Sequence, residues 1–115
     1  MAPLLPPVDI FLAQLGQEAR RKALVLFEDL HRAGFKVAES FSKSGVKPQL
    51  EVADRLGAKI CLIIGQKEII DGTVMIRDMD GGIQEVVDYK KIIPEIKKRL
   101  EKMAVVNSEI LGKNS

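Results

Sequence analysis

The most apolar segment of the chain, residues 58–64, strongly limits the folds that are open to it. The segment reads Ala-Lys-Ile-Cys-Leu-Ile-Ile, and Lys59 is its one polar residue. A continuous apolar run of this length is typical of a strand that is covered on both faces. We therefore expect an α/β protein in which this segment forms the middle of the sheet.

Apolar residues at strand and helix spacing divide the rest of the chain. The expected strands are residues 8–15, 35–41, 58–64, 73–79 and 83–87, and the expected helices are residues 17–33, 47–56 and 92–103. The order is therefore β-α-β-α-β-β-β-α. The two β-α-β passages require parallel neighbours, and Asp80-Gly81-Gly82 predicts a hairpin turn, which forces one antiparallel strand. The predicted architecture is a three-layer α/β/α sandwich with a five-stranded mixed sheet.

The length of 115 residues allows one compact domain. Three prolines predict that residues 1–7 form an extended leader or linker, and the folded domain is expected over residues 8–104. Residues 105–115 lose the apolar period, which predicts a frayed tail. No apolar run reaches the ~18 residues of a membrane-spanning helix, and the first residues lack the pattern of a signal peptide, so we expect a cytoplasmic protein.

Residues for catalysis or for metal binding are few. His31 is the one histidine and lies beside Arg32 on the polar side of the first helix, where a solvent-facing role is favoured. Cys61 is the one cysteine, and its apolar neighbours predict a buried side chain. One His and one Cys on different elements fall short of a metal site. The loop after the first strand has a single glycine, Gly16, and Glu18 would repel an anion there, so a nucleotide cofactor is disfavoured.

The charge of the chain and its polar segments favour a local binding site. The formal net charge is only +2, so any contact with nucleic acid must be local. In α/β sheets, ligands usually lie beyond the carboxyl ends of the parallel strands. Gln66, Lys67 and Glu68 follow the central strand directly and are expected at that position.

Several segments, taken in their order and spacing, resemble the C-terminal anticodon-binding domain of the class IIa aminoacyl-tRNA synthetases. They are residues 15–20 (LGQEAR), 46–59 (VKPQLEVADRLGAK), 63–68 (IIGQKE), 71–74 (DGTV) and 77–78 (RD). The K-x-Q-L-x-x-A pattern and the Arg-Asp ending are most similar to the histidyl branch of that family. Gln66 departs from the pattern, because an acid is common at this position in the histidyl branch.

The resemblance implies that the domain holds the anticodon loop of a tRNA. Bases in a loop can splay out and expose their edges to side chains. Glu68 can accept hydrogen bonds from a guanine, and Arg77, on the adjacent strand, can donate to a neighbouring base. We expect these two side chains at the same rim of the sheet, with Gln66 as a third RNA-binding residue. The structural alternatives are a cap on the following turn for Glu68, and for Arg77 a salt bridge with Glu68, Asp78 or Glu85.

The start of the second helix is the expected contact with phosphates. The candidate residues are Lys43, Lys47 and Gln49, where backbone N–H groups add to the attraction. The alternative for Lys43 is a solvated loop charge. Phe41 could stack on a base, although a position at the edge of the core is favoured.

The resemblance implies a module and not an enzyme. The function it implies is recognition of the tRNA anticodon loop for a histidine–tRNA ligase, and the catalytic residues are expected in a missing N-terminal catalytic domain. ATP and Mg²⁺ would bind to that catalytic domain, and no cofactor is expected in this chain. An alternative is that the domain is reused for protein interaction or regulation. A flavodoxin-type nucleotide binder is disfavoured by the missing phosphate loop.

Overall fold

The computed structural model describes residues 8–40 and 45–113 of the chain. The helices and strands follow in the order β1 (Ile10–Gln14), α1 (Gln17–Arg32), β2 (Val37–Glu39), α2 (Val46–Arg55), β3 (Ile60–Ile64), α3 (Gln66–Asp71), β4 (Thr73–Asp78), β5 (Gln84–Asp88), the 3₁₀ turn η1 (Tyr89–Lys91) and α4 (Ile92–Lys113). Within the described ranges, no helix combines the length and the apolar character that crossing a membrane requires.

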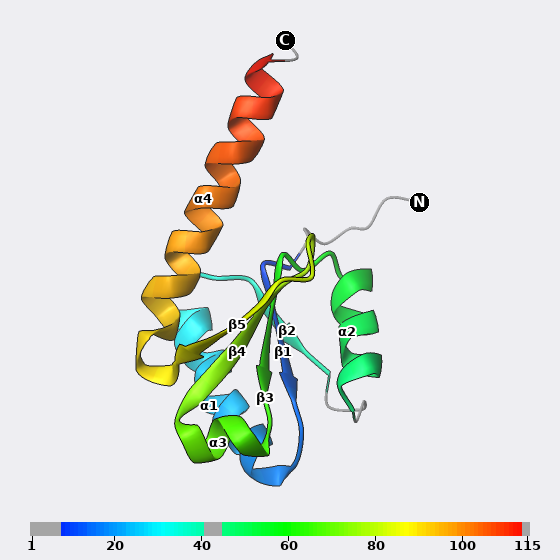
Figure 1. The fold of residues 1–115 in the computed structure, drawn as a ribbon, viewed down its shortest axis with the longest axis vertical. Helices are drawn as coiled ribbons and strands as arrows, with labels where there is room; N and C mark the ends of the chain where they lie inside the picture. Colours follow the sequence, from blue (N-terminus) through cyan, green and yellow to red (C-terminus); the bar gives the residue numbers. More distant parts are fainter. Residues whose placement is uncertain (1–7, 41–44, 114–115) are drawn as a thin grey trace.

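The five strands form one mixed sheet in the order β2-β1-β3-β4-β5 (Figure 1). β1 is parallel to β2 and β3, whereas β4 is antiparallel to both β3 and β5. β3 lies in the middle, and all five of its residues are buried. The predictions of a central strand at this position and of a single antiparallel strand are therefore confirmed.

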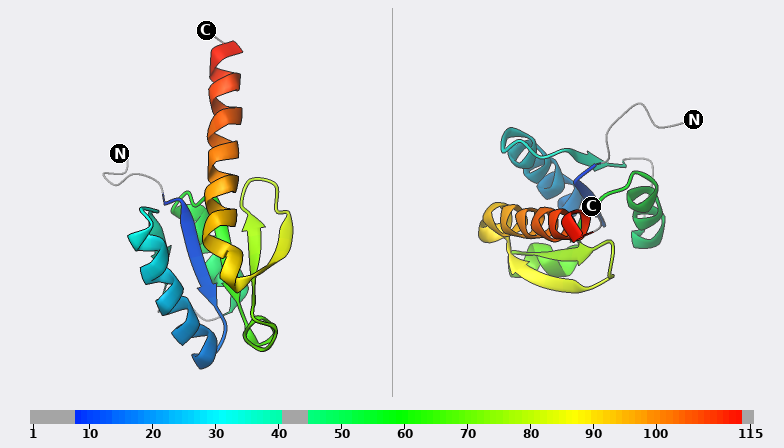
Figure 2. Two further views of the ribbon diagram at one scale, coloured as in Figure 1. Left: turned by 90° about the vertical axis from the view of Figure 1, so that its left-hand side faces the viewer. Right: turned by 90° about the horizontal axis from the view of Figure 1, so that it is seen from above.

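Helices cover both faces of the sheet, and the predicted three-layer sandwich is confirmed (Figure 2). Alternate strand residues point to opposite faces, so the sheet feeds two separate cores. The first core lies under α1 and α4 and contains, from the sheet, Ile10, Leu12, Ile60, Leu62, Ile64, Val74 and Ile76. The second core lies under α2 and contains Phe11, Ala13, Cys61 and Ile63.

The second face is covered only in part. α2 packs on β1 and β3, and no helix of the described residues lies over β4 and β5 on that side (Figure 1). Val86 of β5 is accordingly 59% exposed. This half of the sheet is therefore accessible to a partner.

Two helices differ from the sequence-based expectation. Residues 66–71, where no helix was expected, form the short helix α3, which ends at Gly72 in the left-handed conformation with φ 69°. α4 continues to Lys113, so the prediction of a frayed tail from residue 105 is wrong up to that residue. The apolar period is lost there, but no proline interrupts the segment. The expected leader, residues 1–7, lies outside the described residues.

Candidate nucleic-acid interface

Three helices begin at the edge where the parallel strands end. The N-caps of α1, α2 and α3 are Gly16, Gly45 and Gly65. Lys47 lies in the first turn of α2 and Gln66 in the first turn of α3, and both are exposed. We call this edge the carboxyl rim. Lys47 and Gln66 therefore lie where the sequence predicted them.

Glu68 also lies near the carboxyl rim, but its carboxylate is engaged. Its Oε1 accepts a hydrogen bond from the backbone N–H of Gly65 at 2.8 Å, and the residue is only 9% exposed. This contact satisfies the N-cap N–H of α3, as in one half of a capping box. The capping role, which the sequence left as the alternative, is the one that the geometry shows.

Gln49 does not lie on the surface, so its predicted contact with phosphate is wrong. Its side chain is fully buried. Its Oε1 accepts from the N–H of Gln14 at 2.9 Å, and its Nε2 donates to the carbonyls of Gln14 at 2.8 Å and Gly45 at 3.0 Å. β2 is paired with β1 only as far as Leu12 and Glu39. The Gln49 amide therefore continues the pairing of β1 beyond the end of β2 and ties the first turn of α2 to the sheet.

Arg77 lies at the opposite end of the sheet from Glu68. In the β3–β4 ladder it pairs with Cys61, close to the amino end of β3, whereas Glu68 follows the carboxyl end of β3. Arg77 lies four residue steps along β4 from Thr73, which is about 13 Å at roughly 3.3 Å per step. The prediction of one shared rim is therefore wrong, because β4 runs antiparallel to β3.

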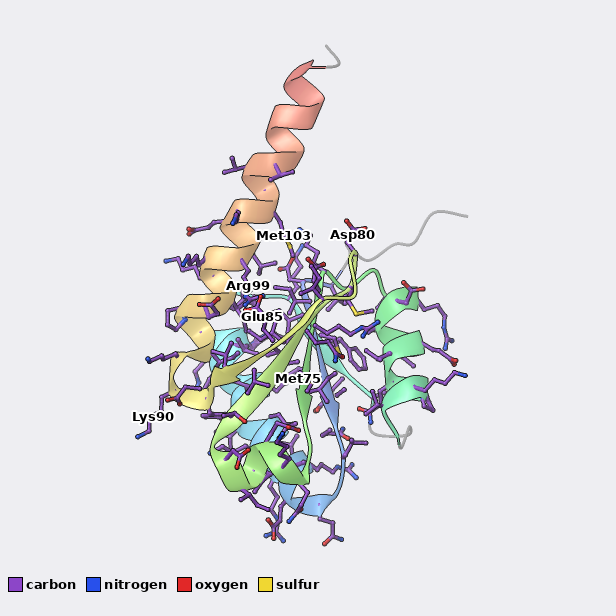
Figure 3. The ribbon with its side chains drawn as sticks, in the orientation of Figure 1. Met75, Asp80, Glu85, Lys90, Arg99 and Met103 are labelled. Atoms are coloured by element: carbon purple, nitrogen blue, oxygen red, sulfur yellow. The ribbon has the colours of Figure 1, made fainter. Side chains whose placement is uncertain are left out.

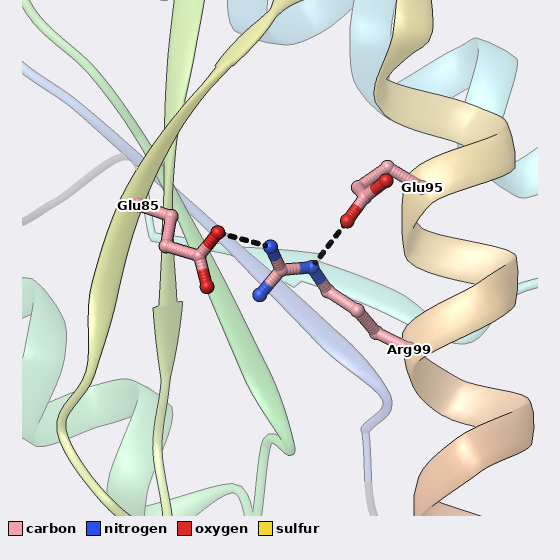
Figure 4. Close-up of polar contacts among 3 residues, drawn as sticks. All are labelled: Glu85, Glu95 and Arg99. Carbon is pink, nitrogen blue, oxygen red and sulfur yellow. Dashed lines mark hydrogen bonds and ion pairs between the residues drawn. The ribbon is translucent and has the colours of Figure 1, made fainter.

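The Arg77 side chain is held by a neighbour on β5. Its Nη1 donates to Gln84 Oε1 at 3.1 Å. None of the three carboxylates considered as salt-bridge partners pairs with it in the described part of the chain. Glu85 instead binds Arg99 of α4 at 3.1 Å, on the other face of the sheet (Figure 4). The Arg77 guanidinium, half-buried, thus keeps donors for another partner.

The uncovered face of β4 and β5 carries a continuous surface around Arg77. Its cross-strand pairs are Arg77 with Gln84, Met75 with Val86, and Thr73 with Asp88. These six residues, which we call the open strip, alternate with Val74, Ile76 and Val87, which face the first core. Met75 lies near the middle of the open strip (Figure 3). An apolar centre flanked by donors and acceptors offers a base both a stacking surface and hydrogen bonds.

Glu39, which the sequence did not single out, ends β2 near the carboxyl rim. Its Oε2 is buried without a hydrogen-bond partner. Burial raises the pKa of this carboxyl above its ordinary value, and the charge of Arg20 offsets part of the increase. The residues of β5 in the open strip were also missed, although the predicted hairpin places Gln84 opposite Arg77.

Cys61 and His31, which were considered for catalysis, have the burial and the exposure that the sequence predicted. Cys61 is buried, and burial raises the pKa of its thiol to about 12. His31 is exposed, and its ring stacks on that of Phe27. The described residues contain no group of three or more His, Cys, Asp or Glu that could hold a metal ion. Lys43 and Phe41 lie outside the described residues.

Comparisons with known proteins identify the family of the chain. Residues 9–99 match the family described as the anticodon binding domain. The histidine–tRNA ligases of Staphylococcus saprophyticus and Thermosipho africanus are both 36% identical to it, over 78% and 81% of this chain and 21% and 22% of their own lengths. The chain therefore spans about a fifth of the length of these relatives.

Solved structures agree with this comparison. The histidyl-tRNA synthetase of Nostoc sp. matches with a TM-score of 0.76 and 28% identity, over 83% of this chain and 23% of that one. The apo enzyme of Staphylococcus aureus matches with a TM-score of 0.74 and 28% identity, over 79% and 23%. The RNA binding domain of threonyl-tRNA synthetase from Cryptosporidium parvum shares the fold, with a TM-score of 0.72, 22% identity and coverage of 80% and 23%.

Proposed function

This chain belongs to the anticodon binding domain family, and we propose that it recognises the anticodon loop of a histidine-accepting tRNA as one module of a histidine–tRNA ligase. The observation that carries the proposal is the open strip. It is an uncovered sheet face with Arg77 at one end and a partly apolar centre, on a chain whose net charge is only +2. Such a face suits a few unstacked bases better than a long duplex, which is held mainly through its phosphates.

The bases would lie along β4. Arg77 donates to the acceptors on a base edge, as arginine does to the O6 and N7 atoms of guanine. Met75 and Val86 provide the apolar surface on which a neighbouring base stacks. The separation of about 13 Å between Arg77 and Thr73 is long enough for a short stretch of a few nucleotides. Arg77 and the carboxyl rim would therefore read the two ends of a short stretch of bases, and not adjacent bases.

The carboxyl rim supplies the second contact. Gln66 is exposed and carries both a donor and an acceptor, so it can bind a base edge. Glu68 can accept from a base only through the lone pairs that its contact with Gly65 leaves. Lys47, and Lys43 in the preceding segment, would bind phosphates and fix the register of the RNA.

The remaining chemistry of the ligase would lie outside this chain. Because the chain spans about a fifth of its relatives, we propose that an N-terminal catalytic domain binds ATP, Mg²⁺ and histidine, and that the chain alone is no enzyme. Its partners would be the tRNA and that catalytic domain. A role in protein synthesis would place it in the cytoplasm.

The proposal is tested by the affinity of the chain for an RNA stem-loop that carries the histidine anticodon. Arg77→Ala should weaken binding by about 1 to 3 kcal/mol and relax the preference at one base, because a base contact is lost. Lys47→Ala should weaken binding to all sequences alike and reduce the salt dependence of log K by about 1, because a phosphate contact is lost. Fluorescence anisotropy at several salt concentrations measures both.

The matched control is Arg55→Ala, because this exposed residue lies at the far end of α2 from Lys47. It should leave the affinity unchanged. If the unmodified chain binds the loop equally well after the anticodon is changed, the chain does not read the anticodon. If Arg77→Ala and Lys47→Ala act alike on every anticodon variant, the assigned roles are wrong.

A further inference from the structure

Arg77 and Gln84 form a pair across the two strands of the open strip. They are direct partners in the β4–β5 ladder, and Arg77 Nη1 donates to Gln84 Oε1 at 3.1 Å. Side chains that lie directly opposite each other on an antiparallel pair are close enough to hold one another in place. Gln84 is exposed, and a hydrogen bond at the surface adds little to stability. The main consequence of this bond is therefore the orientation of Arg77.

The turn between β4 and β5 fixes the position of the two residues relative to each other. The N–H of Gly82 donates to the carbonyl of Asp78 at 2.7 Å, and the N–H of Asp78 donates to the carbonyl of Ile83 at 2.8 Å. Gly82 has a φ of 73°, which residues with a side chain rarely adopt. A Cβ atom at Gly82 would lie 3.5 Å from Arg77 Nη2, so the guanidinium group lies beside the turn. Gln84 and the turn thus flank different nitrogens of that group.

The neighbours of Arg77 in the sheet do not neutralise its charge. Gln84 on β5 is neutral, and Cys61, the partner of Arg77 on β3, is a thiol whose pKa burial raises to about 12. Glu85, the acidic residue next to Gln84, faces the other side of the sheet and binds Arg99 at 3.1 Å (Figure 4). A neutral acceptor orients a cation without neutralising it, whereas a carboxylate would do both. The pair thus combines a fixed direction with an available positive charge.

The guanidinium group keeps enough donors to bind a base. An arginine carries several N–H donors in a planar fork, and Gln84 binds only one of its nitrogens. Two parallel N–H groups pair with the O6 and N7 atoms of guanine, a contact that distinguishes guanine from the other bases. This contact requires the fork to lie in the plane of the base, and a loose arginine side chain must be ordered before it can form. Gln84 supplies this order before the RNA binds.

We propose that Gln84 is a specificity-determining residue of the open strip, because it holds the guanidinium of Arg77 in the orientation that reads the O6 and N7 atoms of a guanine. Gln84 is a positioning residue, and Arg77 makes the contact with the base. This inference rests on the proposed RNA recognition, and it assigns a guanine to the end of the open strip that carries Arg77. The preference for that base then depends on a residue that does not itself touch it.

Base analogues in the RNA stem-loop with the histidine anticodon test the proposal. Each guanosine of the loop is replaced in turn by 7-deazaguanosine, which lacks the N7 acceptor, or by inosine, which keeps O6 and N7 and lacks only the 2-amino group. At the guanosine that Arg77 reads, the 7-deaza change should raise the dissociation constant about fivefold, and the inosine change should leave it within about twofold. We call the first ratio, measured by fluorescence anisotropy, the N7 preference. A chain that binds every loop without an N7 preference overturns the inference.

Two changes of Gln84 separate its oxygen from its size. Gln84→Met keeps the size and removes the acceptor, so the N7 preference should fall below about twofold, because a loose guanidinium can bind other acceptors of the RNA instead. Gln84→Glu keeps an acceptor and should retain the N7 preference within about twofold, while it weakens binding of every loop alike, because a carboxylate repels phosphates. The matched control is Ile83→Met, a change at a neighbour that is 63% exposed, and it should alter neither quantity. Circular dichroism verifies that the three variants are folded.

A double-variant cycle distinguishes this inference from the proposed function. Arg77→Ala should abolish the N7 preference, and Gln84→Met added to it should change no dissociation constant by more than about twofold, because Gln84 acts through Arg77. If Arg77→Ala abolishes the N7 preference and Gln84→Met keeps it, the RNA recognition stands and the inference is overturned. The same holds if Gln84→Met acts equally with and without Arg77. If no loop is bound, or if Arg77→Ala leaves binding unchanged, the recognition of RNA by the open strip fails and the inference fails with it.

Discussion

Replacing Gln49 by methionine should destabilise the fold, although the change keeps the size of the side chain. The Gln49 amide accepts from and donates to the backbone of Gln14, at 2.9 and 2.8 Å, and donates to Gly45 at 3.0 Å. Gln14 is itself only 7% exposed. Methionine would fill the space and leave the N–H and the carbonyl of Gln14 without these partners.

The magnitude follows from these contacts. A buried polar group that loses its partner costs about 1 to 3 kcal/mol, so the two groups of Gln14 cost about 2 to 6 kcal/mol. The carbonyl of Gly45 adds little, because Gly45 is exposed and water can replace the amide. Burying an apolar group in place of the amide stabilises the fold by about 1 kcal/mol. We expect a net loss of about 1 to 5 kcal/mol, a large part of the 5 to 15 kcal/mol that holds a typical domain folded.

Urea unfolding, followed by circular dichroism, measures this loss. With an m value of about 1.5 kcal/mol per molar, a loss of 3 kcal/mol lowers the midpoint by about 2 M. Lys47→Met, an exposed change in the same helical turn, should alter stability by less than about 0.5 kcal/mol. If Gln49→Met also changes the free energy of unfolding by less than about 0.5 kcal/mol, the hydrogen bonds of Gln49 do not stabilise the fold. The predicted contact of Gln49 with phosphate would then be open again.

Two further changes test single groups. Glu68→Ala should cost about 1 kcal/mol of unfolding free energy, because α3 loses its cap, whereas Glu68→Gln keeps an oxygen for the N–H of Gly65 and should cost less than about 0.5 kcal/mol; equal urea midpoints for the two variants would contradict the capping role. Alkylation of Cys61 at pH 8, followed by mass spectrometry, should be at least about 100-fold slower in the folded chain than in denaturant, because burial raises the pKa of the thiol from 9.0 to about 12. Since the folded pKa of Cys61 lies above the unfolded one, its contribution to stability is complete below about pH 9 and is lost as the pH rises toward 12; comparable labelling rates in both states would show that the thiol is accessible.

The apolar spacing of the sequence was sufficient to predict the layers and the central strand, because burial of apolar residues decides both. It did not reveal α3, since six residues span too few turns to show a period. The signals were present in Glu68, three residues after Gly65, and in Gly72 at the end. The spacing also ended α4 too early, because it reports where a helix packs and not where the helix itself ends.

The positions of the candidate site residues followed only in part from the sequence. Glu68 and Arg77 were expected together, but the antiparallel direction of β4 separates them, and this direction followed from the hairpin that the sequence itself predicts. The burial of Gln49 was harder to foresee, because a glutamine paired with the backbone looks the same in sequence as one on the surface. Its position four residues before the buried Ala53 was the available signal.

Gln49 and Glu68, the two candidate RNA-binding residues that are buried, still affect the proposed interface. Gln49 fixes the first turn of α2, which carries Lys47, and Glu68 fixes the first turn of α3, which carries Gln66. Binding costs free energy when loose groups must be ordered, so contacts on a first turn that is already held bind at lower cost. In the proposed interface, Lys47 and Gln66 therefore make the contacts with RNA, and Gln49 and Glu68 hold them in place. A change at either buried residue should consequently weaken RNA binding only as far as it loosens the helix start.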